Sequence, residues 1–589
     1  MITAVAPARR RGVLSLATRQ RVDHGLWLAL ALGVCASGPV IAATIHGLID
    51  GWLPAGDQAN IATRAYDVLT SHSSLVGLHS DASAAINQPV YSLGPMLFWL
   101  LALPARLGSP GWMTLTMGLV NTGAIIGVVV LARRRGGRAL MFIAAVAIVL
   151  MSRSLAPEVL HDMWNPSAGL FPFTLLIFLC WSLACGEYRL LPLAVLVVSF
   201  VVQCQLAFVP PCLAIMAIGL AGLALSLRGS ETRALHPRGG RTVWQWAIAA
   251  LVVGVVCWTP PLIDQIQGKP GNLTNVVKAA TTSTPKLGAG VGWHAVVRAV
   301  GVPPWWLRNP ASPWNRKFEV RASSSAVATV STVLILMALV GVAAIGVLRR
   351  RAELWAGGLI ALALCAGLFA VAEATPTKRV LAETLGYTLW WGSPAGMFVW
   401  TMLAWSCVRL LSELAPARTR APSVASTAGV VAVAAAAAAA VSLAERPDYH
   451  LPEYRPLAKL YAGLQEGVPA RRTVLLVGYL GNRTFRFKMA ARFAMVRRGI
   501  RPLSPGIDVR LGSFYELDHH RYDCAVYVQD RSRSPARQAA EVARFSFEDG
   551  TGSYPVTVWV SPAGCPRSRA LARAAPSSNR WASSGTPTL

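Results

Sequence analysis

The sequence predicts a mainly α-helical, polytopic membrane protein, in which a bundle of about eleven transmembrane helices precedes a small extracytoplasmic α/β domain. The first observation is composition: the 589 residues are 54% hydrophobic and 14% charged, whereas soluble domains carry roughly 25% charged residues. The second is that the apolar residues gather in runs of about 20, the length needed to cross a bilayer. The third is a change to a polar composition from about Glu445.

The positions of the basic residues decide the number of spans, because Lys and Arg are enriched in cytoplasmic loops. Five Arg residues between Arg9 and Arg21 place the N-terminus in the cytoplasm. Asp57 follows the first predicted span and is therefore expected outside. The next basic loop, Arg133–Arg138, lies in the cytoplasm only if a single span separates it from the loop that contains Asp57. We therefore interpret 92–107 as a juxtamembrane or re-entrant element. The predicted spans are 25–48, 113–132, 139–155, 168–185, 190–208, 209–227, 243–260, 325–348, 354–372, 387–410 and 425–443.

This topology predicts a multi-pass protein of the plasma (inner) membrane with a transmembrane domain over residues 25–444. A basic cytoplasmic segment, 1–24, precedes it, and an extracytoplasmic domain, 445–569, follows it, with a disordered tail at 570–589. The remaining basic loops fall inside, and the outer loops are 50–112, 156–167 and 261–324. The inside loops carry Glu187 and Arg189, Arg228 to Arg241, Arg349 to Arg351, and Arg418 with Arg420.

The C-terminal region alternates apolar runs with polar turns, which predicts an α/β domain. Residues 472–479, 522–528 and 554–560 have the composition of strands, and 485–498 has helical spacing that ends at a glycine. Cys524 and Cys565 lie in this region and can form a disulfide if it is exported. The other eight cysteines fall in apolar runs, where packing explains them.

The charge balance does not indicate nucleic-acid binding. The chain has 55 Lys plus Arg against 27 Asp plus Glu, a net charge of +28, which in a soluble protein would indicate such a partner. Here the Arg residues lie between apolar runs, where they act as orientation signals. We therefore expect no nucleic-acid partner.

The first acidic cluster is Gly56-Asp57-Gln58, directly after the first predicted span. A carboxylate held at a membrane surface can act as a general base and deprotonate an acceptor hydroxyl. The alternatives are a solvated loop acid or a helix N-cap, because 59–69 has a helical composition and Asp caps helices well. Asp57 is the first candidate catalytic residue.

The second cluster, in the outer loop 156–167, supplies acids, an imidazole and an amide within eight positions. Its candidate residues are Glu158, His161, Asp162 and Asn165. Such a set can bind sugar hydroxyls or a divalent metal, so the sequence leaves undecided whether the protein has a metal cofactor. The alternative is structural: Asn165-Pro166 can begin the next helix, and Trp164 suits the interfacial belt.

Further polar residues near the outer face are candidates for substrate binding. Gln203 and Gln205 lie near the outer end of a span, where amides face a bundle interior or a cavity and where helix–helix hydrogen bonding is the alternative. Cations beside outer aromatic residues can hold a lipid phosphate, although interfacial anchoring explains them equally well. The candidate cations are Arg308, Arg316, Lys378 and Arg379, and Asp264 at the start of the third outer loop is a further candidate for substrate binding.

Together these segments resemble the GT-C superfamily of membrane glycosyltransferases, especially its protein O-mannosyltransferase and aminoarabinose transferase members. The resemblance covers about 25–410: Gly56-Asp57 in the first outer loop, the segment Tyr91–Pro104, the acids of the second outer loop, and an extracytoplasmic C-terminal domain. The chain departs from the family at Gln58, where an acid is frequent, and at Ser92-Leu93-Gly94-Pro95, which replaces a Lys or His with paired prolines.

The resemblance implies an inverting transfer of a sugar from a polyprenyl-phosphate donor to an acceptor hydroxyl of the envelope, on a polysaccharide, lipid or protein. It maps the catalytic base to Asp57 and an assisting acid to Asp162 or Glu158. Cations such as Arg308, Arg316 or Lys378 would stabilise the leaving phosphate. The alternatives are a transporter or flippase of a lipid-linked substrate, for which we find no inverted repeat, and a non-catalytic membrane scaffold.

Overall fold

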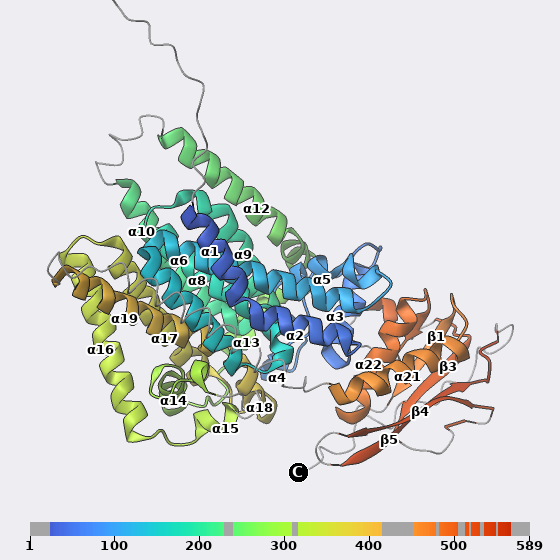
Figure 1. Cartoon of the computed structure of the whole chain (residues 1–589). Coiled ribbons are helices and arrows are strands. Elements are labelled where there is room, and N and C mark those ends of the chain that lie inside the picture. Colours follow the sequence, from blue (N-terminus) through green and yellow to red (C-terminus); the bar gives the residue numbers. More distant parts are fainter. Residues whose placement is uncertain are drawn as a thin grey trace, which may run out of the picture.

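The chain folds into a large helical bundle and a smaller C-terminal α/β domain that packs beside it (Figure 1). The predicted segments 1–24 and 570–589 lie outside the described residues, except for His24. The computed structural model describes residues 24–228, 239–308, 316–414, 451–478, 482–504, 513–517, 520–530, 535–536, 538–548 and 552–566.

Helices overlap each of the first ten predicted spans, and the eleventh, 425–443, lies outside the described residues. Within the described part, seven helices are long and apolar enough to cross a membrane, or eight if the pair bent by 46° near Ser37 is one span. Eleven spans therefore stay a prediction. The bundle helices are α1 (His24–Ala36), α2 (Gly38–Ile49), α6 (Gly111–Ser154), α7 (Asn165–Ala168), α8 (Leu170–Ala184), α9 (Leu191–Cys204), α10 (Val209–Arg228), α12 (Gly239–Gln267), α16 (Ala326–Leu348), α17 (Ala352–Ala374) and α19 (Gly392–Leu414).

Helix α6 contains two of the predicted spans. Its 44 residues include non-helical backbone at Gly136 and Gly137. The φ of Gly137 is 65°, a conformation that glycine adopts without steric cost. The break falls inside the predicted loop Arg133–Arg138, so the two predicted spans coincide with two helical segments joined at this glycine pair.

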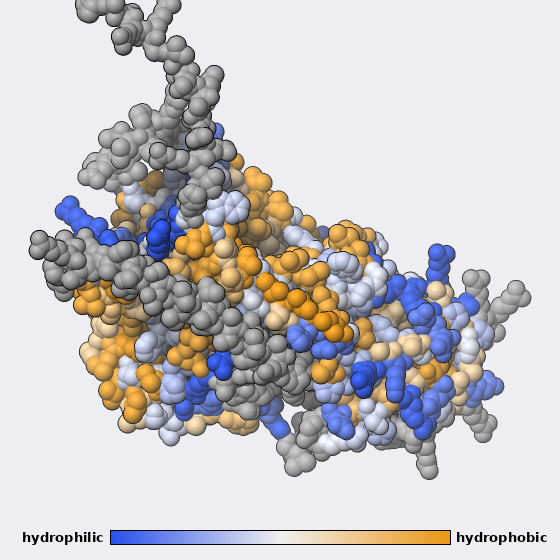
Figure 2. Space-filling model, viewed as in Figure 1, coloured by the Kyte–Doolittle hydropathy of each residue, from blue (hydrophilic) through white to orange (hydrophobic). Residues whose placement is uncertain are grey.

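The bundle has a buried centre and apolar outer helices. Every residue of α8 is buried except Leu175, which is half-buried, as expected for a helix that is hydrophobic all round. Helices α12 and α16 expose aliphatic side chains such as Leu251, Val255 and Val330. Figure 2 shows hydrophobic residues gathered over the bundle and hydrophilic ones over the C-terminal domain. Exposed apolar area of this extent indicates a surface that contacts a membrane or another protein, and the length of the apolar helices favours a membrane.

Segments predicted to be cytoplasmic contact one another at one end of the bundle. Arg134 forms an ion pair of 2.6 Å with Glu187, which joins two of the predicted inside loops. Arg349 pairs with Glu413 at 2.9 Å, at the end of the last described bundle helix. These two contacts agree with the predicted grouping of the loops, and the topology itself stays a prediction.

Segments predicted to lie outside also contact one another. Gln58 of the first outer loop meets Asp162 of the second. The backbone N–H of Tyr91 donates to Asn272 Oδ1 at 2.9 Å, which joins the first and third outer loops. The contacts therefore join inside loops to inside loops and outer loops to outer loops. The basic residues predict which of the two groups faces the cytoplasm.

The outer loops are largely helical. The first contains α3 (Gly56–Asp67), α4 (Ser83–Ile86) and α5 (Met96–Leu101). With six residues, α5 is about 9 Å long, too short to cross a membrane, as the interpretation of 92–107 requires. The third outer loop and the connection before α19 contain α13 (Asn272–Thr281), α14 (Ala289–Val300), α15 (Arg316–Arg321) and α18 (Arg379–Thr388).

The C-terminal domain is a five-stranded sheet of order β2-β1-β3-β5-β4 with two helices, α21 and α22. The three strands and the helix predicted from sequence are confirmed, and α21, β2 and β4 were missed. A disulfide joins Cys524 and Cys565, the pairing left open above. The elements are α21 (Leu451–Gly467), β1 (Thr473–Gly478), α22 (Asn482–Val496), β2 (Arg501–Leu503), β3 (Cys524–Gln529), β4 (Ala540–Glu548) and β5 (Ser553–Ser561).

Candidate functional site

Helix α3 places Asp57 in its first turn. The N-cap residue is Ala55, with extended backbone, and Gly56 follows at a φ of 50°. The alternative that Asp57 is the N-cap is therefore wrong, because Asp57 lies inside the helix. Its carboxylate is half-buried, and the helix dipole stabilises a negative charge at this end.

The neighbouring residue, Gln58, joins the two acidic clusters. Its side-chain amide donates to Asp162 Oδ2 at 3.4 Å, a long hydrogen bond. The other carboxylate oxygen, Oδ1, accepts from the backbone N–H of Trp164 at 3.0 Å. Asp162 is 3% exposed and has a donor at each oxygen, so it is suited to hold the second outer loop against α3. Asp57 is the more exposed acid and the better candidate base.

Tyr387 of α18 adds a phenol to this region, and the indoles of Trp164 and Trp390 lie beside it. The Tyr387 hydroxyl donates to Asp81 Oδ2 at 2.6 Å, and the Asp57 carboxylate is within electrostatic range of the same hydroxyl. The Trp164 ring makes edge contacts with Tyr387, at 4.9 Å between centroids, and with Trp390, at 5.5 Å. Acids from both outer loops therefore lie beside a group of aromatic rings.

Asp81, Tyr387 and Trp390 were not among the residues predicted from sequence. Asp81 belongs to the predicted first outer loop, so a survey of every acid in that loop would have found it. The pairing of Asp81 with Tyr387 spans 306 positions. No local pattern predicts such a contact.

All four candidate residues of the second cluster are buried, and Glu158 and His161 pack against helix α2. Glu158 is 8% exposed and His161 is 1% exposed, both at a short 3₁₀ turn. The His161 ring lies against α2, since a Cβ added at Gly47 would be 3.0 Å from its Cε1 atom. These two residues sit where the second outer loop packs on α2, and their burial favours a supporting role.

The candidate amides join chain segments near the same face. Asn165 begins α7, as the structural alternative predicted, and its Nδ2 donates to Gln205 Oε1 at 3.0 Å. Gln203 donates to the carbonyl of Cys257 at 2.9 Å and accepts from the N–H of Met96 at 3.3 Å. Gln203 is 1% exposed, so it holds α9, α12 and α5 together.

Asp264 orders the beginning of the third outer loop. Its Oδ2 atom accepts from the backbone N–H of Asn272 at 2.9 Å. The Asn272 side chain in turn donates to the carbonyl of Tyr91 at 3.1 Å. Asp264 therefore stabilises the turn into α13 and, through it, the contact with the first outer loop.

Two of the four candidate cations are held by protein partners. Arg308 pairs with Glu319 at 2.9 Å. Arg316 is buried, donates to Ser393 Oγ at 2.7 Å and lies over the Trp305 ring at 4.8 Å. Burial lowers the pKa of Arg316 to about 10. This burial makes Arg316 a poor ligand for an incoming phosphate.

The other two cations lie at the start of α18. Arg379 forms an exposed pair with Glu383 at 2.8 Å. Lys378 Nζ donates to the carbonyl of Ala84 at 2.5 Å, and its distance to Asn87 Oδ1 is 3.5 Å. Lys378 therefore contacts the segment that follows Asp81, which makes it the best placed of the predicted phosphate ligands.

The sequence leaves open whether the second cluster binds a divalent metal. The described residues contain no group of three or more His, Cys, Asp or Glu side chains that could hold an ion. No protein-family model matches the chain, and no curated protein is significantly similar to it. The assignment of function therefore depends on the geometry above.

Proposed function

We propose that this protein is an inverting membrane glycosyltransferase that moves a sugar from a polyprenyl-phosphate donor to an envelope hydroxyl. The observation that carries the proposal is the meeting of the two outer acidic loops at Gln58 and Asp162. Residues 104 positions apart are joined there, beside the rings of Trp164 and Tyr387. Acids next to aromatic rings suit a sugar, since the acids accept its hydroxyl hydrogens and the ring faces pack on its C–H groups.

In the proposed reaction the acceptor oxygen attacks the anomeric carbon of the sugar. A new carbon–oxygen bond forms as the bond from that carbon to the phosphate oxygen breaks, and the lipid phosphate leaves with the electron pair. Asp57 takes the acceptor proton as general base. Lys378 supplies positive charge for the leaving phosphate.

The other residues in this proposal position the reactants. Asp162 holds Gln58, and therefore the first turn of α3, while Asp81 and Tyr387 bind sugar hydroxyls. A lipid donor accounts for a site at the edge of the membrane, where apolar helices can hold its chain. The protein would lie in the inner membrane with its N-terminus in the cytoplasm and the site outside, as the distribution of Arg residues predicts.

The test is sugar transfer from radiolabelled polyprenyl-phosphate donors in membranes that contain the native chain or Asp57→Asn at matched expression. Loss of a general base reduces the rate by about 10²- to 10⁴-fold, so we expect transfer by the variant to fall at least a hundredfold. Asp50→Asn is the matched control, because Asp50 is an exposed acid at the end of α2. It should transfer at the native rate.

Two results would contradict the proposal. Equal transfer by the native chain and Asp57→Asn would exclude Asp57 as the base. Transport of a labelled lipid-linked sugar across the membrane, without transfer to any acceptor, would instead support the flippase alternative.

A further inference from the structure

Helix α3, which carries Asp57, shares its hydrophobic core with the C-terminal domain. One cluster of buried residues includes Ala59, Ala62 and Ala65 of α3 together with Phe487 and Ala491 of α22. The two helices pack against each other, and Figure 1 shows α22 beside α3 at the junction of the two parts of the chain. The small alanine side chains allow this close approach.

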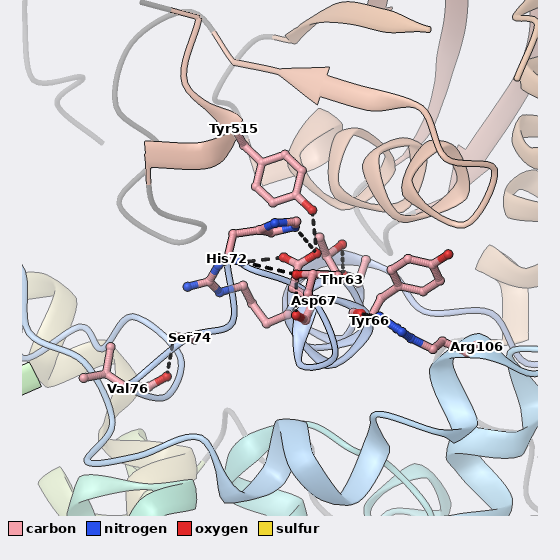
Figure 3. Close-up of polar contacts among 11 residues, drawn as sticks. Thr63, Tyr66, Asp67, His72, Ser74, Val76, Arg106 and Tyr515 are labelled. Atoms are coloured by element: carbon pink, nitrogen blue, oxygen red, sulfur yellow. Dashed lines mark hydrogen bonds and ion pairs between the residues drawn. The ribbon is translucent and has the colours of Figure 1, made fainter. Parts of the chain in front are cut away.

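The C-terminal end of α3 is held by a buried polar contact from the C-terminal domain. Asp67 is 1% exposed, and its Oδ1 atom accepts from the Tyr515 hydroxyl at 2.8 Å. His72 Nε2 lies 3.1 Å from the same oxygen, and the His72 ring stacks on Phe514 at 3.6 Å between centroids. Figure 3 shows Tyr515 pointing from the C-terminal domain toward Asp67 and His72 of the first outer loop.

The N-terminal end of α3 also lies against the C-terminal domain. A Cβ added at Gly56, directly before Asp57, would be 3.7 Å from Arg486 Cγ and 3.7 Å from a ring carbon of Phe485. Arg486 is itself anchored by an ion pair with the buried Glu453 of α21. The domain therefore touches α3 at the residue next to the proposed base.

A third contact fixes the end of the first outer loop. The Arg497 guanidinium donates to the carbonyl of Leu107 at 2.8 Å and to that of Gly108 at 2.6 Å. The domain thus contacts the loop at both ends of α3 and before α6. The buried hydrogen bond between Asp67 and Tyr515 is a specific contact, which indicates that the domain is docked on the loop.

We propose that the C-terminal domain holds the Asp57-bearing helix in its working position, with Tyr515 as the positioning residue. The effect on sugar transfer rests on the proposed function, whereas the effect on α3 does not. Removing the Tyr515 hydroxyl leaves the Asp67 carboxylate with His72 and with Arg64, which is 3.8 Å away, as its partners. The loss of the donor from the C-terminal domain is costly because the carboxylate charge stays desolvated. Helix α3 would then separate from the domain more often, and Asp57 would spend less time in place.

The test compares Tyr515→Phe with Tyr461→Phe in the full-length protein in lipid nanodiscs. Tyr461 is the matched control, because among the described residues its buried hydroxyl has no hydrogen-bond partner. Hydrogen exchange of the amides over 56–67 should rise about tenfold in Tyr515→Phe, the change expected for one hydrogen bond to a charged group. Tyr461→Phe should leave this exchange unchanged.

Exchange that rises only near Asp67, or equally in both variants, would overturn the positioning role. Transfer assays then separate this proposal from the proposed function. We expect kcat to fall about three- to tenfold in Tyr515→Phe with the donor KM unchanged, since the donor contacts are intact. If the exchange changes as expected and the native chain shows no transfer, the docking holds and the proposed function fails. If Asp57→Asn abolishes transfer and Tyr515→Phe keeps the native kcat, the function holds and the positioning role fails.

Discussion

Replacement of Gln58 by Glu would place two carboxyl groups at the distance now occupied by a hydrogen bond. Gln58 Nε2 lies 3.4 Å from Asp162 Oδ2, and an oxygen in its place would be an acceptor facing an acceptor. Two unit charges at this separation repel by about 5 kcal/mol at an effective dielectric constant of about 20. The family that this chain resembles often has an acid at this position. The repulsion from Asp162 is a physical reason for an amide at Gln58 in this chain.

Protonation limits this cost. One carboxyl of the pair can take up a proton, which at pH 7 costs about 1.4 kcal/mol for each unit between the pH and an ordinary Glu pKa of about 4.3. The free energy of unfolding of Gln58→Glu should therefore fall by up to about 4 kcal/mol at pH 7 and by about 1 kcal/mol at pH 5. The sign follows from linkage: the folded-state pKa of the new carboxyl is raised, so stability is lost as the pH rises.

The assay is thermal unfolding of the purified protein in detergent at pH 5 and pH 7.5. Gln58→Met is the control, because it keeps the side-chain length and removes the hydrogen bond without adding a charge. We expect Gln58→Met to be destabilised equally at both pH values and Gln58→Glu to be destabilised mainly at pH 7.5. If the two variants lose the same stability at both pH values, the contact between Gln58 and Asp162 is not present in solution.

Two further predictions concern the site and the domain. Tyr387→Phe removes the hydroxyl that donates to Asp81, and transfer should fall about tenfold through a higher donor KM, measured by steady-state kinetics; an unchanged KM would exclude a sugar-binding role for this hydroxyl. The double variant Cys524→Ala with Cys565→Ala opens a loop with a sequence separation of 41, which should destabilise the C-terminal domain by about 4 kcal/mol in the chain-entropy description. Limited proteolysis of the native chain and of the double variant under non-reducing conditions measures this change, and equal resistance of the two proteins would contradict it.

The elements of the fold that the sequence predicts well are those with a strong local pattern. Apolar runs of sufficient length located the helices of the bundle, and the short helix α5 agrees with the interpretation of 92–107 as a segment that does not span. Strands β1 and β3 contain continuous apolar runs, β5 is rich in Val and aromatic residues, and all three were predicted. Strand β2 has only three residues, and β4 carries charged residues at the edge of the sheet, so neither shows such a run.

The candidate site divides in the same way. Asp57, Asp162, Asn165 and Lys378 were predicted because each is a polar residue beside a membrane-spanning run, where desolvation makes polar groups rare. Burial then changes the roles of others: Arg316 is enclosed by the end of α18 and the start of α19, and Gln203 by α9, α12 and α5. Sequence cannot distinguish a polar side chain that faces a ligand from one that bonds its neighbours, because both occur at the same kinds of position.

The sequence by itself determined that this chain is a helical membrane protein with a terminal α/β domain, because hydrophobic run length and residue alternation are local properties of the chain. It also determined which polar residues lie between apolar segments. Tertiary structure alone decided that Gln58 meets Asp162, that Tyr387 meets Asp81, and that Tyr515 reaches across 448 positions to Asp67. Such contacts depend on how the packed helices bring distant segments together, and no local energetic preference records them.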